Sequence, residues 1–270
     1  MTLLAHSLLF NPASTLGWYA GCGDGTSVDI QTRMIDEMDK YGADTMSLNI
    51  MNEDLSSPFA GEYMNSPLDN RKYDLFEGFV AMLKARGKQV VIVFFDGDEH
   101  SAINATVKYP FHEFRERHAP FMEIVTRHFA PVASGFCIGI ETNRYVSMEM
   151  VEQALVWVER FAIRTQADGT IYHIPVFTHE QNVGWKNDNP YLKRPVPRNA
   201  KIAGFEMSNH PYYGDDVTPE HMVREVTALY ESCHKQIWVM ESNSKKGGRA
   251  KDQNNALADL PFVVGVDGVM

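Results

Sequence analysis

The sequence predicts an α/β protein that folds as a (β/α)8 TIM barrel, with residues 1–270 forming one domain. Eight short runs rich in Val, Ile and aromatic residues alternate with amphipathic segments, at a period of roughly 30 residues. These runs are apolar on both faces, which is typical of parallel strands covered by helices. A doubly wound open sheet is the alternative. However, the first run is not followed directly by a Gly-rich phosphate-binding turn and a helix.

The first half of the chain is expected to supply four strands and four helices. Strands are expected at residues 3–10, 44–50, 89–96 and 135–141. Helices are expected at residues 27–41, 72–86, 111–129 and 148–165. Ser27 and Ser147 are candidate N-caps, and Gly87 is a candidate C-cap. Pro120 is expected to split or kink the third helix, because proline removes one helical hydrogen bond.

The second half of the chain is expected to complete the barrel. Strands are expected at residues 171–177, 201–207, 235–241 and 262–266. A helix opens at Thr218 and Pro219 and continues to about residue 230. The segment around Trp185 is rich in proline, so any helix between the strands at 171–177 and 201–207 must be short.

Composition excludes several classes of function. The formal net charge is −10, and no strong Lys/Arg cluster stands out, which argues against a nucleic-acid partner. The three cysteines are scattered without metal-ligand spacing, so neither a disulfide framework nor a cysteine-ligated metal site is expected. No apolar run is long enough to span a membrane. No signal peptide is visible, so we expect a protein that is cytoplasmic or released without one.

Two of the apolar runs lead directly into a glutamate. Residues 135–140 precede Glu141, and residues 235–240 precede Glu241. In parallel barrels, functional groups collect at the carboxyl ends of the strands, so both acids are expected at the same rim. A lone acid at a strand end is more often a cap or a salt-bridge partner. A facing pair, however, is what a glycosidase needs, because one carboxyl protonates the leaving oxygen while the other attacks or activates water.

The pattern resembles the superfamily of retaining glycoside hydrolases built on (β/α)8 barrels. The resemblance implies that Glu141, after strand four, is the general acid/base and that Glu241, after strand seven, is the nucleophile. The Asn-His-Pro-Tyr segment at residues 209–212 is similar to the element whose phenol hydrogen-bonds the nucleophile in that superfamily. Two positions differ from its usual pattern: Ile140 stands where Asn is usual, and residues 262–267 lack a sugar-stacking Trp.

The implied reaction is a double displacement on a carbohydrate, with no cofactor and no metal. Glu141 would be protonated near neutral pH because burial and the neighbouring carboxylate raise its pKa. Retention requires the two carboxyls to lie about 5–5.5 Å apart. Rings that stack on sugars and groups that bond hydroxyls are candidate substrate contacts. The candidates are Trp18, Asn49, Asp96, Asp98, His100, Asn143, His179, Trp185, His210 and Tyr212.

Two other functions fit a barrel with these residues. The first is a divalent-metal-dependent isomerase or hydrolase, although no HxH or HExxH spacing is present. Its ligands would be Glu141, His179, Glu206 and Glu241, or Asp98 with His100. The second is a catalytically inactive barrel that only binds glycans.

Overall fold

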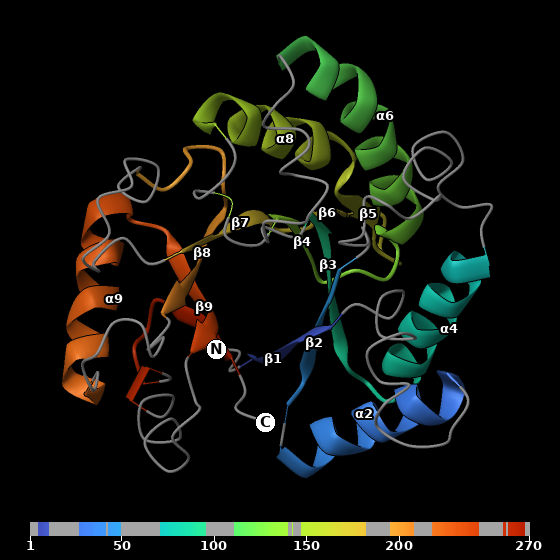
Figure 1. Ribbon diagram of the computed structural model, residues 1–270, viewed down its shortest axis with the longest axis horizontal. Coiled ribbons are helices and arrows are strands. Elements are labelled where there is room, and N and C mark those ends of the chain that lie inside the picture. Colours follow the sequence, from blue (N-terminus) through green and yellow to red (C-terminus); the bar gives the residue numbers. More distant parts are fainter. Residues whose placement is uncertain are drawn as a thin grey trace.

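Eight parallel strands form a closed barrel in the computed structural model. The structure describes residues 5–10, 27–41, 43–49, 71–95, 111–139, 142, 147–181, 195–207, 218–242, 256–257 and 259–267. Around the ring the strands follow the order β1-β10-β9-β8-β7-β4-β3-β2, and helices surround it (Figure 1). The ring closes where β1 pairs with β10, with Ala5 opposite Gly265. This closure confirms the predicted barrel and excludes the open sheet.

The bounds of most elements agree with the sequence-based ranges to within a few residues. The barrel strands are β1 (Ala5–Phe10), β2 (Thr45–Asn49), β3 (Gln89–Phe95), β4 (Gly135–Gly139), β7 (Val176–Gln181), β8 (Ile202–Met207), β9 (Gln236–Ser242) and β10 (Val263–Asp267). The helices are α2 (Ser27–Tyr41), α4 (Arg71–Ala85), α6 (Phe111–Phe129), α8 (Met148–Phe161) and α9 (Pro219–Cys233). No helix in the described part of the chain is long and apolar enough to cross a membrane.

Local signals fix several helix ends as expected. The Ser147 hydroxyl accepts a hydrogen bond from the Met150 backbone N–H at 3.2 Å, which caps α8. Gly87 ends the turn after α4 with a φ of 71°, a conformation that favours glycine. Pro120 does not split this helix, since α6 is one span from Phe111 to Phe129 that includes it. Pro120 is exposed, while Phe121 beside it is fully buried, so packing of the inner face keeps the helix continuous.

The sequence-based position of the fifth barrel strand was wrong. Residues Ile171–His173 (β6) pair antiparallel with Ile163–Thr165 (β5) and form a separate hairpin. The barrel strand is instead Val176–Gln181, which pairs with β4 and β8. The hairpin also ends α8 at Phe161, before the expected residue 165.

Turn chemistry explains the hairpin. The Asp168 carboxylate accepts hydrogen bonds from the backbone N–H and the hydroxyl of Thr170, at 2.9 and 2.7 Å. Gly169 has a φ of 83°, which suits a tight turn. The short apolar run that follows suggests a buried strand in the sequence, yet Ile171 is 63% exposed. This run therefore lies outside the core.

Side chains of the barrel strands alternate between a helix-facing core and an interior core. On β7, Val176 packs in the helix-facing core and Phe177 packs in the interior. The Phe177 ring lies 5.2 Å from the Trp238 ring, measured between centroids. Among the described residues, the other hydrophobic side chains of this interior cluster are Val91, Val93, Cys137 and Ile202. The interior is a packed core rather than a pore.

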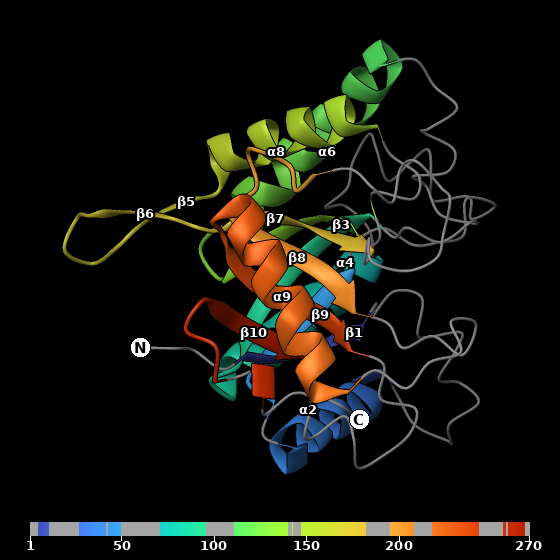
Figure 2. The same cartoon turned by 90° about the vertical axis from the view of Figure 1, so that its left-hand side faces the viewer.

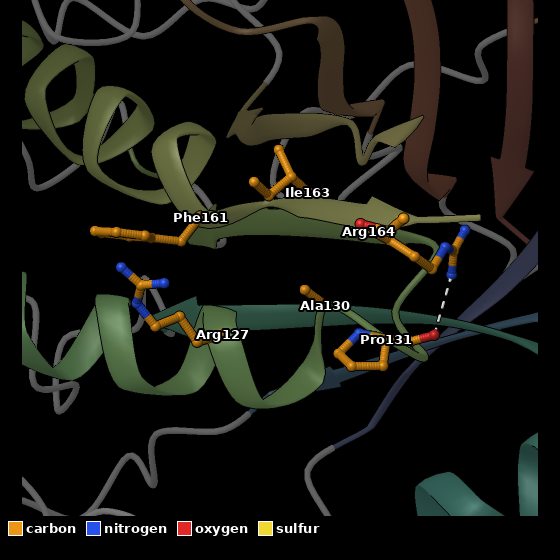
Figure 3. A pocket seen from close by; sticks show the side chains of 7 residues that line it. Arg127, Ala130, Pro131, Phe161, Ile163 and Arg164 are labelled. Atoms are coloured by element: carbon orange, nitrogen blue, oxygen red, sulfur yellow. Dashed lines mark hydrogen bonds between the residues drawn. The ribbon is translucent and has the colours of Figure 1, made fainter. Parts of the chain in front are cut away.

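The β5–β6 hairpin projects from the end of the barrel at which the strands begin (Figure 2). A pocket of about 390 Å³ lies beside the hairpin, where α6 and α8 end. Its lining is Arg127, Ala130, Pro131, Phe161, Ile163, Arg164 and Thr165. The Arg127 guanidinium lies 4.0 Å from the Phe161 ring centroid, and Arg164 donates to the Pro131 carbonyl at 3.3 Å (Figure 3). This pocket is therefore distant from the carboxyl ends of the strands.

Candidate active site

The two predicted catalytic glutamates follow strands that lie apart in the ring. β4 ends at Gly139, and Glu141, two residues later, lies outside the described residues. Glu241 belongs to β9; the structure describes its backbone but not its side chain. The strands β7 and β8 lie between β4 and β9. Because all barrel strands are parallel, β4 and β9 run toward the same rim.

The pairing of β8 with β9 shifts by one residue next to Glu241. Phe205 pairs with Val239, but the following pair is Glu206 with Glu241, so the residue at position 240 is an insertion in β9. Ile202 packs in the interior core, so positions 204 and 206 occupy the same row of β8. The shift brings position 241 into that interior row. Simple alternation from Trp238 would have put position 240 there instead.

A buried polar pair links the ends of the fourth and fifth barrel strands. The Thr142 hydroxyl donates a hydrogen bond of 2.8 Å to Oε1 of Glu180. Thr142 is fully buried, and Glu180 is 7% exposed. By alternation from Val176, position 180 belongs to the helix-facing row of β7. The bond therefore ties Thr142, the residue after Glu141, to β7 from the helix side of the barrel.

The charge of Glu180 also acts on the barrel interior. Burial raises the pKa of the Cys137 thiol to about 12, and the nearby Glu180 carboxylate contributes to the rise. The thiol lies 3.4 Å from the Gly139 carbonyl oxygen, to which it donates. Cys137 is therefore a neutral, buried thiol at neutral pH and is unsuited to act as a nucleophile.

His179 is the one predicted substrate contact whose side chain the structure describes. It precedes Glu180 on β7, pairs in register with Gly204 and is fully buried. Asn49 ends β2 in register with Val93, and its side chain is not described. The other candidates, which lie outside the described residues, are Trp18, Asp96, Asp98, His100, Asn143, Trp185, His210 and Tyr212. All these substrate contacts stay predictions.

Sequence reasoning gave no role to the Thr142–Glu180 pair. The expected fifth strand ended at residue 177, which placed Glu180 just beyond its carboxyl end. Once β7 extends to Gln181, Glu180 lies on a strand that neighbours β4. Thr142 follows β4 closely, so the shared rim was a signal that could have brought the two together.

No cluster of three or more His, Cys, Asp or Glu side chains that could hold a metal occurs among the residues described above. Glu141, named for the metal alternative, lies outside them. The backbones of Glu206 and Glu241 are described without their side chains.

Comparison with known proteins shows likeness in structure alone. No family model matches the chain, and no curated protein matches it in sequence. An endo-1,4-β-D-mannanase from Thermotoga petrophila RKU-1 has a TM-score of 0.63 at 11% identity, covering 100% of this chain and 90% of its own. The β-glycosidase from Thermosphaera aggregans has a TM-score of 0.62 at 10% identity, covering 98% and 86%. A β-glucosidase from Pyrococcus furiosus has a TM-score of 0.58 at 11% identity, covering 88% and 74%. The chain thus has the barrel fold of these glycosidases.

Proposed function

We propose that this chain is a retaining glycoside hydrolase that cleaves O-glycosidic bonds of an oligo- or polysaccharide. Glu241 is the nucleophile, and Glu141 is the general acid/base. The observation that carries the proposal is the register shift in β9, which moves position 241 into the interior row at the rim. Glu141 follows β4, three strands around the ring, so the two acids approach a bound sugar from different sides.

The chemistry proceeds in two steps. In the first, the Glu241 carboxylate attacks the anomeric carbon, while Glu141 gives its proton to the leaving oxygen. The product is a covalent glycosyl-enzyme, and the leaving group departs as an alcohol. In the second step, Glu141 takes a proton from water as the water attacks the same carbon, which releases the sugar and restores both side chains.

A neutral, β-linked glycan is the substrate class we favour. The structurally similar enzymes include a 1,4-β-mannanase and a β-glucosidase. A net charge of −10 disfavours uronic-acid polymers, because like charges repel at the approach to the rim. The predicted aromatic contacts Trp18, Trp185 and Tyr212 suit stacking on the apolar faces of hexose rings.

Two substitutions test the assignment. Wild type is assayed on aryl β-glucosides, aryl β-mannosides and β-1,4-mannan, beside Glu141→Gln and Glu241→Gln. Each variant should lose about 10³-fold or more in kcat, because each removes a group that forms or breaks a bond. Azide should replace the missing carboxylate, giving the β-glycosyl azide with Glu141→Gln and the α-glycosyl azide with Glu241→Gln. Glu149→Gln, on the exposed start of α8, is the matched control and should keep full activity.

Full activity in either site variant would remove that residue from the mechanism. Turnover that a chelator abolishes and a divalent cation restores would instead support the metal-dependent alternative. Glycan binding without turnover on the whole panel would support the binding-only barrel.

A further inference from the structure

Glu180 is a buried carboxylate to which the proposed two-glutamate mechanism gives no role. Burying a carboxyl group is costly unless hydrogen bonds compensate, so the partners of Glu180 are structurally important. One of them is Thr142, whose hydroxyl lies 2.8 Å from Oε1 of Glu180 in a buried contact. This bond therefore joins Thr142, the residue after Glu141, to β7.

The chain around Glu141 is held on both sides. On one side, Gly139 pairs in register with Phe95 of β3. On the other side, Thr142 is held by Glu180. Three Cα–Cα steps join Gly139 to Thr142, which allows a span of at most about 11 Å. A linker this short transmits a change at either anchor to the residues between them, so the contacts of Gly139 and Thr142 bear directly on Glu141.

We propose that Thr142 and Glu180 form a buried tether that positions Glu141 for proton transfer. The inference rests on the proposed function, and it makes Thr142 and Glu180 positioning residues that do not touch the substrate. Releasing the tether leaves Glu141 in the chain but lets its carboxyl drift. A displacement of about 1 Å at a reacting group lowers the rate by about 100-fold.

Thr142→Val is the direct test, because valine keeps the shape of threonine and lacks the donor. We expect kcat to fall about 10- to 100-fold on substrates with a sugar or alkyl leaving group, with little change in KM. A dinitrophenyl glycoside needs no proton to depart, so its glycosylation rate should change less than about 2-fold. Thr142→Ser keeps the hydroxyl and should recover most of the loss.

Thr178→Val is the matched control. Thr178 lies on β7 two residues before Glu180 and is fully buried. Its hydroxyl has no hydrogen-bond partner in the described part of the chain. The same substitution here should leave kcat unchanged on both kinds of substrate, so it separates loss of the tether from loss of a buried hydroxyl.

A second variant guards against misfolding. Thr142→Val leaves the Glu180 carboxylate without one donor, which can destabilise the fold. Glu180→Leu combined with Thr142→Val removes both members of the pair, so neither side chain is left with a polar atom that has lost the other. Far-UV circular dichroism and urea unfolding establish that this variant is folded. It should show the same dependence on the leaving group.

The kinetics decide the matter. In a Glu141→Gln background, Thr142→Val should cause no further loss, because the positioned carboxyl is already gone. Wild-type kcat on poor leaving groups in a folded untethered variant would overturn the tether. Equal losses of kcat/KM, which reports glycosylation, on good and poor leaving groups would overturn it as well. If Glu141→Gln is itself fully active, the acid/base assignment fails, and the role of the tether fails with it.

Discussion

Gly135 and Phe177 meet inside the barrel so closely that a single added methyl group tests how the interior is packed. A Cβ atom at position 135 would lie 3.0 Å from Cε1 and 3.7 Å from Cζ of Phe177. Phe177 is fully buried, and its ring packs against Trp238, so it has little room to move aside. Gly135→Ala should therefore cost about 1–3 kcal/mol of unfolding free energy, as overpacking does.

The same methyl group should be accommodated when the ring is absent. Phe177→Leu deletes both ring atoms that face position 135 and should cost about 1–3 kcal/mol by itself. In that background, the methyl group from Gly135→Ala enters the vacated space. The double variant should then be more stable than the sum of the single costs predicts, by a coupling energy of about 1 kcal/mol.

Urea unfolding followed by circular dichroism measures all four chains of this cycle, with equal slopes confirming that the denatured states are alike. Gly78→Ala is the control, because a Cβ there meets nothing within 4 Å on the exposed face of α4. It should stabilise the protein by about 0.5–1 kcal/mol through helix propensity. Additivity of the Gly135 and Phe177 changes within about 0.5 kcal/mol would refute this packing of the interior.

Two further outcomes follow from described contacts. Lys88 lies 2.7 Å from the Asp39 carboxylate and holds the pKa of that carboxyl below its ordinary value. In Lys88→Met, an NMR titration should therefore find the pKa of Asp39 higher than in wild type. A lowered carboxyl pKa stabilises the fold above the unfolded-state pKa, and this contribution is lost as pH falls through the folded pKa. The stability difference between wild type and Lys88→Met should therefore shrink in acid, and a constant difference down to about pH 2 would contradict it. The buried Cys137 thiol, whose pKa is about 12, should resist alkylation by iodoacetamide at about pH 8, while the partly exposed Cys233 should react. Peptide mapping that finds equal alkylation rates at the two cysteines would count against this.

Most of the barrel could be predicted from sequence because apolar runs and capping residues carry strong local signals. The run ending at Phe95 and the Ser147 cap are examples that the structure confirms. The fifth strand could not be located in this way, because residues 171–177 form one run rich in Ile, Val and aromatic residues, of which only the last two belong to the barrel strand. Whether such a run enters the barrel depends on which neighbours it can pair with, and composition does not encode that.

The candidate site, like the fold, could be predicted from the sequence only in part. The sequence shows that an apolar strand leads into Glu241. The register shift that moves position 241 into the interior row is a property of the pairing between β8 and β9, which the sequence of one strand does not reveal. Likewise, neither Thr142 nor Glu180 is distinctive alone. Their pairing follows from β4 and β7 being neighbours, and these two strands are separated in sequence by a helix and a hairpin.

The packed interior of the barrel has a consequence for how substrate and product enter and leave. Phe177 and Trp238 pack against each other inside the barrel, where buried side chains fill the described part of the interior. A ligand that binds at the rim formed by the carboxyl ends of the strands must therefore leave from that same rim. Under the proposed chemistry, an outgoing sugar and its incoming successor share one entrance, and inhibition by accumulated product is expected.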